Sequence, residues 1–259
     1  MTATAQAQTV EQPAVQQQLA RARAYELLAR AFREPDAAFV DELRSGRFAR
    51  ELDRALACLP ATSRLRRRLA SEVTAARAEA RTIAAAYQTR FALSGAGGSP
   101  PYEAEYIPIG VFRRMQQMAD VAGFYRGFGL EMGPGSGRPD HLAAEFEFMA
   151  LLAFREAYAR RAGNAGGAAV CRRAQRLFLA DHLARWLPSF AERVAAAGRQ
   201  DAYVSFARAA EAVVAWDARR RRVRAMPLDW ALASGPSGEL PLCPLLDDES
   251  APCMEEGAL

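Results

Sequence analysis

The residues best suited to chemistry lie between positions 101 and 149, where carboxylates are interspersed with aromatic rings. A carboxylate can form charge-assisted hydrogen bonds with a guanidinium group, and neighbouring rings offer apolar surface. Met115, Met118 and Met149 add flexible thioethers that adapt to ligands of varied shape. We therefore expect this segment to bind a peptide that is basic in one part and apolar in another. The candidate peptide-binding residues are Tyr102, Glu103, Tyr106, Asp120, Phe124, Tyr125, Pro139, Asp140, His141 and Glu145.

Each of these residues also has a structural interpretation. Asp140 follows Pro139 at an expected helix start, where a carboxylate satisfies free backbone N–H groups and the helix dipole. His141, beside this cap, can be a hydrogen-bonded structural histidine. Glu145 and Glu147 lie two residues apart on a helix and point to different faces, so at most one of them is expected to face a ligand. Aromatic and Met side chains at helical spacing commonly belong to the core.

The sequence argues against an enzyme. His141 and His182 are its only histidines, and we expect His182 to pack in the core near Trp186. The chain contains no HExxH, GxSxG, P-loop or GxGxxG motif, and no paired Glu-x-x-His motifs of a di-metal helical bundle. Cys243 and Cys253 lie ten residues apart with prolines between them, which is no recognised metal-ligand spacing. We expect no catalytic activity, no metal and no cofactor.

A helical nucleic-acid-binding regulator is the alternative function. The isoelectric point is about 9.1, and arginines cluster at residues 64–68 and 219–224. Against this alternative, no short helix-turn-helix with a basic recognition helix is apparent, and residues 236–259 carry six acids and no base, which would repel a phosphate backbone. The second cluster also fits a helix C-terminus, where cations offset the helix dipole.

Composition indicates a globular protein of the cytoplasm. Hydrophobic residues make up 51% of the 259 residues, which is ample for a buried core. Four scattered cysteines are too few for a disulfide framework, so reduced thiols are expected. The N-terminal segment lacks the basic and apolar regions of a secretory signal, and no run approaches the roughly 20 apolar residues that a membrane span needs. We expect a cytoplasmic location without stable membrane insertion.

The spacing of apolar residues predicts helices along most of the chain. The expected helical segments are about 15–32, 37–43, 48–59, 62–91, 111–128, 139–161, 168–197 and 200–224. Strand-like alternation is absent and β-branched residues are sparse. The sequence therefore predicts an all-α fold, a single-domain helical bundle of about seven or more helices.

The chain divides into three expected parts. Residues 1–12 are expected to be a disordered lead, and Pro13 suits the entry into the first helix. Residues 13–224 form the helical domain, with a loop boundary near 94–101 that is dense in Gly and Pro. Residues 225–259 are expected to be an extended, proline-rich, acidic C-terminal tail.

Five motifs in order along the chain resemble the TorD/DmsD/NarJ family of redox-enzyme maturation chaperones. They are AYELLARAFREPD (24–36), PPYEAEY (100–106), MADVAGFYRGFGLE (118–131), RPDHLAAEFEFM (138–149) and DHLARWLPSF (181–190). The resemblance covers roughly residues 20–220. The glycine-containing run at 133–137 departs from the family pattern.

The resemblance implies an all-helical chaperone that binds the twin-arginine leader and the apo form of a molybdopterin oxidoreductase catalytic subunit, and delays its export until the cofactor is inserted. It ties Pro139, Asp140 and His141 to peptide binding, and Tyr102–Tyr106 to the same groove. The wording of the motifs is closest to the branch that serves type II enzymes such as selenate or chlorate oxidoreductases. Both monomers and dimers fit the family. Asp140→Asn combined with His141→Ala is expected to weaken leader binding without unfolding the chain.

Overall fold

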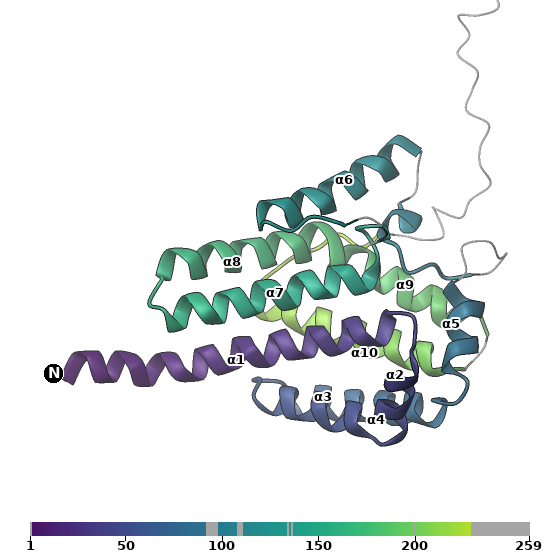
Figure 1. Cartoon of the computed structure of the whole chain (residues 1–259), viewed down its shortest axis with the longest axis horizontal. Coiled ribbons are helices and arrows are strands. Elements are labelled where there is room, and N and C mark those ends of the chain that lie inside the picture. Colours follow the sequence, from purple (N-terminus) through teal and green to yellow (C-terminus); the bar gives the residue numbers. More distant parts are fainter. Residues whose placement is uncertain are drawn as a thin grey trace, which may run out of the picture.

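The computed structural model describes residues 2–91, 98–107, 111–133, 135, 137–198 and 200–228. The helices are α1 (Thr2–Phe32), α2 (Ala37–Arg44), α3 (Arg47–Ala57), α4 (Ser63–Ala78), α5 (Ile83–Phe91), η1 (Glu103–Tyr106), α6 (Val111–Gly127), α7 (Leu142–Arg161), α8 (Ala165–Phe178), η2 (Leu179–Leu183), α9 (Ala184–Ala196) and α10 (Ala202–Arg220) (Figure 1). Here η1 is a 3-10 turn and η2 a π-helical turn. The only extended pairing in the described residues is an isolated bridge between Tyr102 and His141, so the all-α prediction is confirmed.

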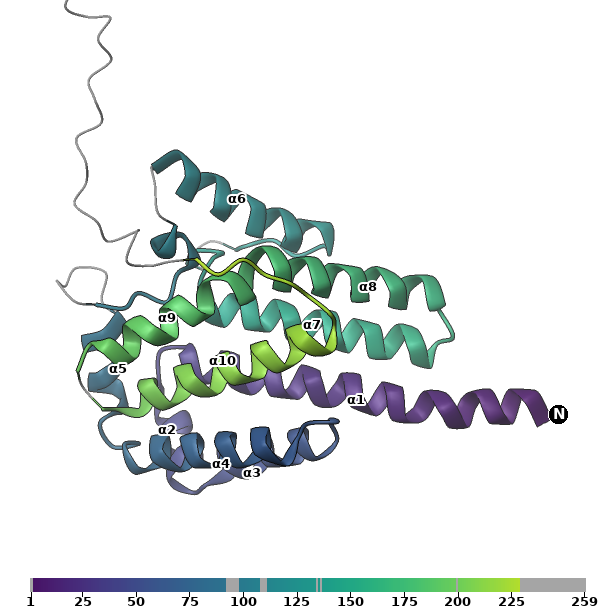
Figure 2. The same cartoon turned by 180° about the vertical axis from the view of Figure 1, so that it is seen from behind.

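The helices form a layered bundle around α1. Helices α1, α7 and α8 lie side by side, and α6 runs along the outer side of α8 (Figure 1). On the other face α10 packs against α4 and α9, and the chain after α10 returns toward the start of α9 (Figure 2). This arrangement leaves α6 at the edge of the bundle, next to η1.

Aromatic rings from five helices meet at the centre of the core. The ring of Phe32 on α1 lies 6.4 Å from Phe91, 6.1 Å from Phe146, 5.7 Å from Phe190 and 6.4 Å from Tyr203. Residues on both sides of the glycine- and proline-rich loop belong to this same core cluster. The described residues therefore share one hydrophobic core, as a single bundle requires.

The predicted helix over 62–91 is two helices. Thr62 caps the first of them, as expected, because its hydroxyl accepts a hydrogen bond from the Leu65 N–H at 3.2 Å. The chain then turns between α4 and α5, where the Thr82 N–H donates to the Glu79 carbonyl at 3.1 Å. The turn directs the rings of α5 onto α10, a tertiary effect that the continuous apolar stripe did not reveal.

Two helix starts differ from the prediction. Helix α1 begins at Thr2 and contains Pro13, whereas the sequence favoured a start near Pro13 after a disordered lead over 1–12. The residues before Pro13 are rich in Ala and Gln, which are good helix formers. Helix α7 begins at Leu142 rather than at Pro139, and His141 is its N-cap. The division of the chain at residues 12, 94–101 and 225 stays a prediction.

The segment that follows α10 packs on the bundle as far as the structure describes it. The Leu228 N–H donates to the Arg185 carbonyl at 2.9 Å, and the Ser189 hydroxyl donates to the Leu228 carbonyl. The predicted acidic tail beyond this point lies outside the described residues. The described residues up to Leu228 border the start of α9, where the candidate site is found.

Candidate functional site

A short bridge joins η1 to the start of α7. The Glu103 N–H donates to the Asp140 carbonyl at 3.0 Å, and the Leu142 N–H donates to the Pro101 carbonyl at 2.9 Å. These bonds bring together two of the motifs found in the sequence, at residues 100–106 and 138–149. The bridge therefore positions most of the predicted binding residues.

The buried side chain of Asp140 stabilises this bridge. This side chain is fully buried and accepts a hydrogen bond from the Ala104 N–H at 3.0 Å. Arg138 donates to both carboxylate oxygens, at 2.9 and 2.7 Å, and also to Glu105 at 2.8 Å. The Arg138 guanidinium lies 4.3 Å from the centre of the Tyr102 ring, within cation–π range. Asp140 is thus an organising carboxylate rather than one that faces a ligand in this conformation.

His141 caps α7 and is neutral. Its Nδ1 accepts a hydrogen bond from the Ala143 N–H at 3.1 Å, and its ring lies edge-on to Tyr102 with 5.0 Å between the ring centres. Burial lowers the pKa of His141 to about 4, with Asp140 opposing that change and Arg138 adding to it. Asp140 therefore does not cap α7, contrary to the structural interpretation of its place after Pro139. An unprotonated imidazole is the acceptor instead.

A buried hydrogen-bonded hub connects η1, α6 and η2. Glu103 accepts from the Gln117 amide at 2.9 Å, and its other oxygen lies 2.9 Å from His182 Nδ1. Burial raises the pKa of Glu103, although its bonds to His182 and Gln117 act in the opposite direction. His182 Nε2 faces the Asp120 carboxylate at 3.6 Å, and the Asp120 side chain is 61% exposed. Asp120 therefore lies where this buried hub reaches solvent.

His182 belongs to the π-helical turn η2. The turn spans Leu179–Leu183 and joins α8 to α9 without a loop. The His182 ring also contacts Phe124, with 5.3 Å between ring centres, and Phe178, with 4.8 Å. The prediction that His182 packs in the core is confirmed, but its hydrogen bonds to the predicted site were missed. A π-helical turn leaves no recognisable sequence pattern, which explains the omission.

Three other predicted residues form the apolar and polar support of the site. The Tyr125 hydroxyl donates to the Pro139 carbonyl at 2.9 Å. Tyr106 is fully buried, and its ring centre lies 5.3 Å from that of Trp186. The Trp186 indole N–H donates to Glu145 at 3.1 Å, and burial raises the pKa of Glu145 well above its ordinary value. These side chains fix the shape of the site from within.

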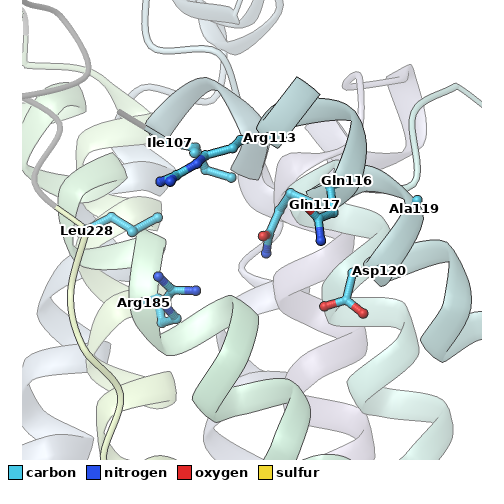
Figure 3. A pocket seen from close by; sticks show the side chains of 8 residues that line it. All are labelled: Ile107, Arg113, Gln116, Gln117, Ala119, Asp120, Arg185 and Leu228. Carbon is cyan, nitrogen blue, oxygen red and sulfur yellow. The ribbon is translucent and has the colours of Figure 1, made fainter. Parts of the chain in front are cut away.

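Two hollows adjoin these residues, one lined in part by residues of the hub and the other in part by residues of the bridge. The first, which we call the α6 hollow, has a volume of about 830 Å³ (Figure 3). Its lining residues are Ile107, Arg113, Gln116, Gln117, Ala119, Asp120, Arg185 and Leu228. The second, the α7 hollow, has a volume of about 460 Å³. Its lining residues are Arg33, Glu34, Tyr87, Tyr102, Met132, Gly137, Arg138, His141, Ala143, Ala144 and Glu147.

The predicted binding residues divide between these hollows and the interior. Asp120 lines the α6 hollow, whereas Tyr102 and His141 line the α7 hollow. Glu103, Tyr106, Tyr125, Asp140 and Glu145 are buried, and Phe124 and Pro139 are half-buried. Most of the predicted carboxylates are therefore not exposed in this conformation. Whether these ten residues bind a peptide stays a prediction.

The hollows also contain residues that sequence reasoning missed. Arg113 and Arg185 lie in the α6 hollow at the end where Ile107 and Leu228 are found, away from Asp120 (Figure 3). The polarity of the hollow thus changes along its length. Arg185 lies within the motif at 181–190, but nothing in the sequence indicates that its side chain faces this hollow.

The described residues contain no group of three or more histidine, cysteine, aspartate or glutamate side chains that could hold a metal ion. Among the same residues, no helix is long and apolar enough to cross a membrane. Cys58 and Cys171 are free thiols, and Cys243 and Cys253 lie outside the described part of the chain. The ionisable groups of the hub, Glu103 and His182, are bonded to one another, so they serve to shape a binding surface.

Comparisons with known proteins point to a single family. Residues 47–192 match the family model of the nitrate reductase delta subunit. The chain is 33% identical over 179 residues to the perchlorate reductase assembly chaperone protein of Dechloromonas aromatica, an alignment that covers 67% of this chain and 77% of the relative. It is 35% identical over 117 residues to the selenate reductase assembly chaperone protein of Thauera selenatis, which covers 44% and 58%. It is 38% identical over 80 residues to the chlorate reductase assembly chaperone protein of Ideonella dechloratans, which covers 30% and 40%.

Proposed function

The chain belongs to the nitrate reductase delta subunit family, the TorD/NarJ type of maturation chaperone, and on this premise we propose that it binds the precursor of a molybdopterin oxidoreductase. The protein is a chaperone rather than an enzyme. In the proposal it binds the twin-arginine leader and the apo form of the catalytic subunit in the cytoplasm, assists cofactor insertion and delays export.

The names of its relatives support a particular class of client. They are described as assembly chaperones for perchlorate, selenate and chlorate reductases. We propose that the client of this chain is a molybdoenzyme of the same type, which reduces an oxyanion. The comparisons give no support to the nucleic-acid-binding alternative.

One exposed face of α6 supports the proposal that the leader binds here. Phe112 and Met115 are 89% and 57% exposed, although both are large and apolar. They lie on the same helical face as Gln116, Ala119 and Asp120, because these positions recur at intervals of three and four residues. Large apolar side chains in solvent mark interaction sites when they adjoin a polar rim. The face combines apolar surface with an exposed carboxylate, as a basic and apolar leader requires.

The exposed carboxylates of the two hollows suit the arginine pair of the leader. Asp120 lines the α6 hollow, and its only ionic neighbour in the described structure is His182. Glu34 lines the α7 hollow, is exposed, and accepts a hydrogen bond from the Gln88 amide at 2.9 Å. By contrast, Glu105 and Glu147 already pair with arginines of this chain. A leader arginine would meet less competition at Asp120 and Glu34.

Calorimetric titration of the full chain with synthetic twin-arginine leaders tests the proposal. Binding at micromolar affinity or better is expected for one leader, with loss of binding when its Arg-Arg pair becomes Ala-Ala. Asp120→Asn should weaken binding by roughly 1 kcal/mol, which is about fivefold, since one charge-assisted contact is lost. Asp41→Asn on α2 is the matched control, because the Asp41 side chain is 76% exposed and far along the chain from the site. Equal affinity for both leaders would contradict the proposal.

The structure changes how the predicted Pro-Asp-His residues should be tested. The two buried carboxylate oxygens of Asp140 together accept three hydrogen bonds, and Asp140→Asn would replace one of these oxygens with an amide NH2 that cannot accept, which would disturb the bridge between η1 and α7. Its combination with His141→Ala is therefore not the fold-preserving variant that the sequence analysis assumed. Asp120→Asn and Phe112→Ser alter exposed side chains and leave the bridge intact.

A further inference from the structure

A third, strongly basic hollow lies away from the candidate site, where α1, α7, α8 and the end of α10 meet. It has a volume of about 790 Å³, and eight of the residues that line it are arginines. We call it the arginine pocket. The only carboxylates in its lining are Glu156 and Asp217, which leaves a surplus of six positive charges. None of its lining residues belongs to the two hollows of the candidate site.

Both carboxylates are already engaged at the floor of the arginine pocket. Asp217 is fully buried and accepts hydrogen bonds from the Arg21 guanidinium and, at 2.8 Å, from the Tyr25 hydroxyl. Glu156 is fully buried and pairs with Arg160 at 3.0 Å and with Arg172 at 3.7 Å. These two carboxylates are taken up by arginines at the floor of the pocket. No other carboxylate in the lining is left to pair with Arg173 and Arg176 at the rim.

The rim arginines face solvent. Arg173 and Arg176 are exposed, and in the described part of the chain neither side chain has a hydrogen-bond or ion-pair partner. They lie three residues apart on α8 and so point the same way. Arg221 lies deeper in the pocket, where burial and the neighbouring charge of Arg21 lower its pKa. A positive potential therefore extends from the floor to the rim.

Arg222 occupies an unusual backbone position at this rim. Its φ is +55°, the only positive φ of a non-glycine residue in the described chain. The Arg222 N–H donates to the Arg219 carbonyl at 3.0 Å, and the Val223 N–H donates to the Ala218 carbonyl at 2.8 Å, as at a left-handed helix end. Glycine is the residue that fits this position without strain. The chain has an arginine there instead, and its side chain lines the pocket.

We propose that the arginine pocket binds a ligand with clustered phosphate groups, such as an oligophosphate. The planar guanidinium fork matches phosphate oxygens in a bidentate manner, and several forks converge here from four helices. The lining contains no aromatic side chain on which a nucleobase could stack. Recognition is therefore directed at the phosphates themselves. The volume falls within the usual range for small-molecule sites.

Calorimetric titration of the full chain with sodium tripolyphosphate tests this proposal, with sodium sulfate as the single-anion comparison. Arg173→Gln combined with Arg176→Gln should weaken tripolyphosphate binding at least tenfold. Arg222→Gly should weaken it several-fold while leaving the melting temperature unchanged or higher, since glycine relieves the backbone strain. Arg64→Gln combined with Arg67→Gln on α4 removes the same charge elsewhere and should leave binding unchanged.

The outcomes separate this site from leader binding and from other anions. Leader affinity should be the same in the Arg173 and Arg176 double variant as in the wild-type chain, so failure of one proposal leaves the other standing. Equal loss of tripolyphosphate affinity in the α4 control, or equal affinity for sulfate, would overturn the proposal in favour of nonspecific charge attraction. Binding of a peptide that covers residues 236–259, with none of tripolyphosphate, would assign the pocket to carboxylates and overturn it as well.

Discussion

Asp217→Asn tests the buried ion-pair network that joins α1 to the end of α10. The Asp217 carboxylate accepts from Arg21 Nε at 3.0 Å and from a second nitrogen of the same guanidinium, and the Tyr25 hydroxyl donates to it at 2.8 Å. Arg21 is only 3% exposed and Asp217 is fully buried. The substitution keeps the shape of the side chain and removes its charge.

The expected loss follows from leaving Arg21 without its counter-ion. Removing one partner of a buried pair costs about 3–5 kcal/mol, and the asparagine oxygen can still accept one hydrogen bond from Arg21 or Tyr25, which offsets about 1 kcal/mol. We expect the free energy of unfolding to fall by about 3 kcal/mol, which corresponds to a melting temperature roughly 6–12 °C lower. The double variant Arg21→Met with Asp217→Leu should lose less than the sum of the single losses, because no buried charge is stranded.

Urea denaturation across a pH series measures this effect. Burial acts to raise the pKa of Asp217, but Arg21 and Arg221 together hold it below its ordinary value. A carboxyl with a lowered folded-state pKa stabilises the fold above its unfolded pKa of about 3.9, and this contribution is lost as the pH falls through the folded pKa. The difference between the wild-type chain and the variant should therefore be largest at neutral pH and shrink below about pH 4.

Asp53→Asn is the matched control for this experiment. The Asp53 side chain is 68% exposed and pairs with Arg66 at 3.0 Å, so the same chemical change is made in a surface ion pair. A loss of under about 1 kcal/mol is expected there. If Asp217→Asn destabilised the chain no more than Asp53→Asn, the network would not be the buried, charge-dependent junction inferred here.

Three further predictions follow from single contacts. Because the pKa of His141 is lowered to about 4, the wild-type chain should lose stability as the pH falls from about 6.5 toward 4. His141→Asn keeps a capping oxygen and should make the stability, measured by urea denaturation, depend less on pH. The same pH dependence in both proteins would contradict this. Trp186→Phe removes the indole N–H that donates to buried Glu145 and should lower the free energy of unfolding by about 1–3 kcal/mol in thermal melts. Trp216→Phe should cost less, because Trp216 makes no such bond in the described structure. Equal losses would refute the contact. Gly46→Ala places a Cβ on a residue with φ of +72° and should cost about 1–2 kcal/mol by chemical denaturation, and unchanged stability would be evidence against that backbone conformation.

Helical periodicity was sufficient to predict the fold class and most helix positions. The segments around Ala37–Arg44, Val111–Gly127 and Ala202–Arg220 match their predicted limits within a few residues. The errors occur where tertiary packing overrides a local pattern. The apolar stripe continues through the turn between α4 and α5, and the predicted helix over 168–197 contains the π-helical turn.

Sequence motifs predicted which residues meet at the candidate site, but not which of them reach its surface. The carboxylates of Glu103 and Asp140 looked available for a ligand, whereas the structure buries both and bonds them to other residues. His182, which bonds to Glu103, lies 79 residues further along the chain, a separation that no periodicity connects. Arg138 lies only two residues before Asp140, but its pairing with Asp140 depends on the fold of the loop before α7. A carboxylate in a motif therefore reveals the position of a site more readily than its exposure.

The difference between buried and exposed carboxylates determines which side chains a leader peptide could contact. In the present conformation a ligand cannot reach Asp140 or Glu103 without breaking the bridge and the hub that they hold, and each broken bond to a buried carboxylate costs about 1–3 kcal/mol. Asp120, at the exposed edge of the hub, can bind a guanidinium without that cost. The buried motif residues thus set the geometry of the α6 face, and the side chains on that face, Phe112 and Asp120 foremost, are the ones that leader-binding variants should alter first.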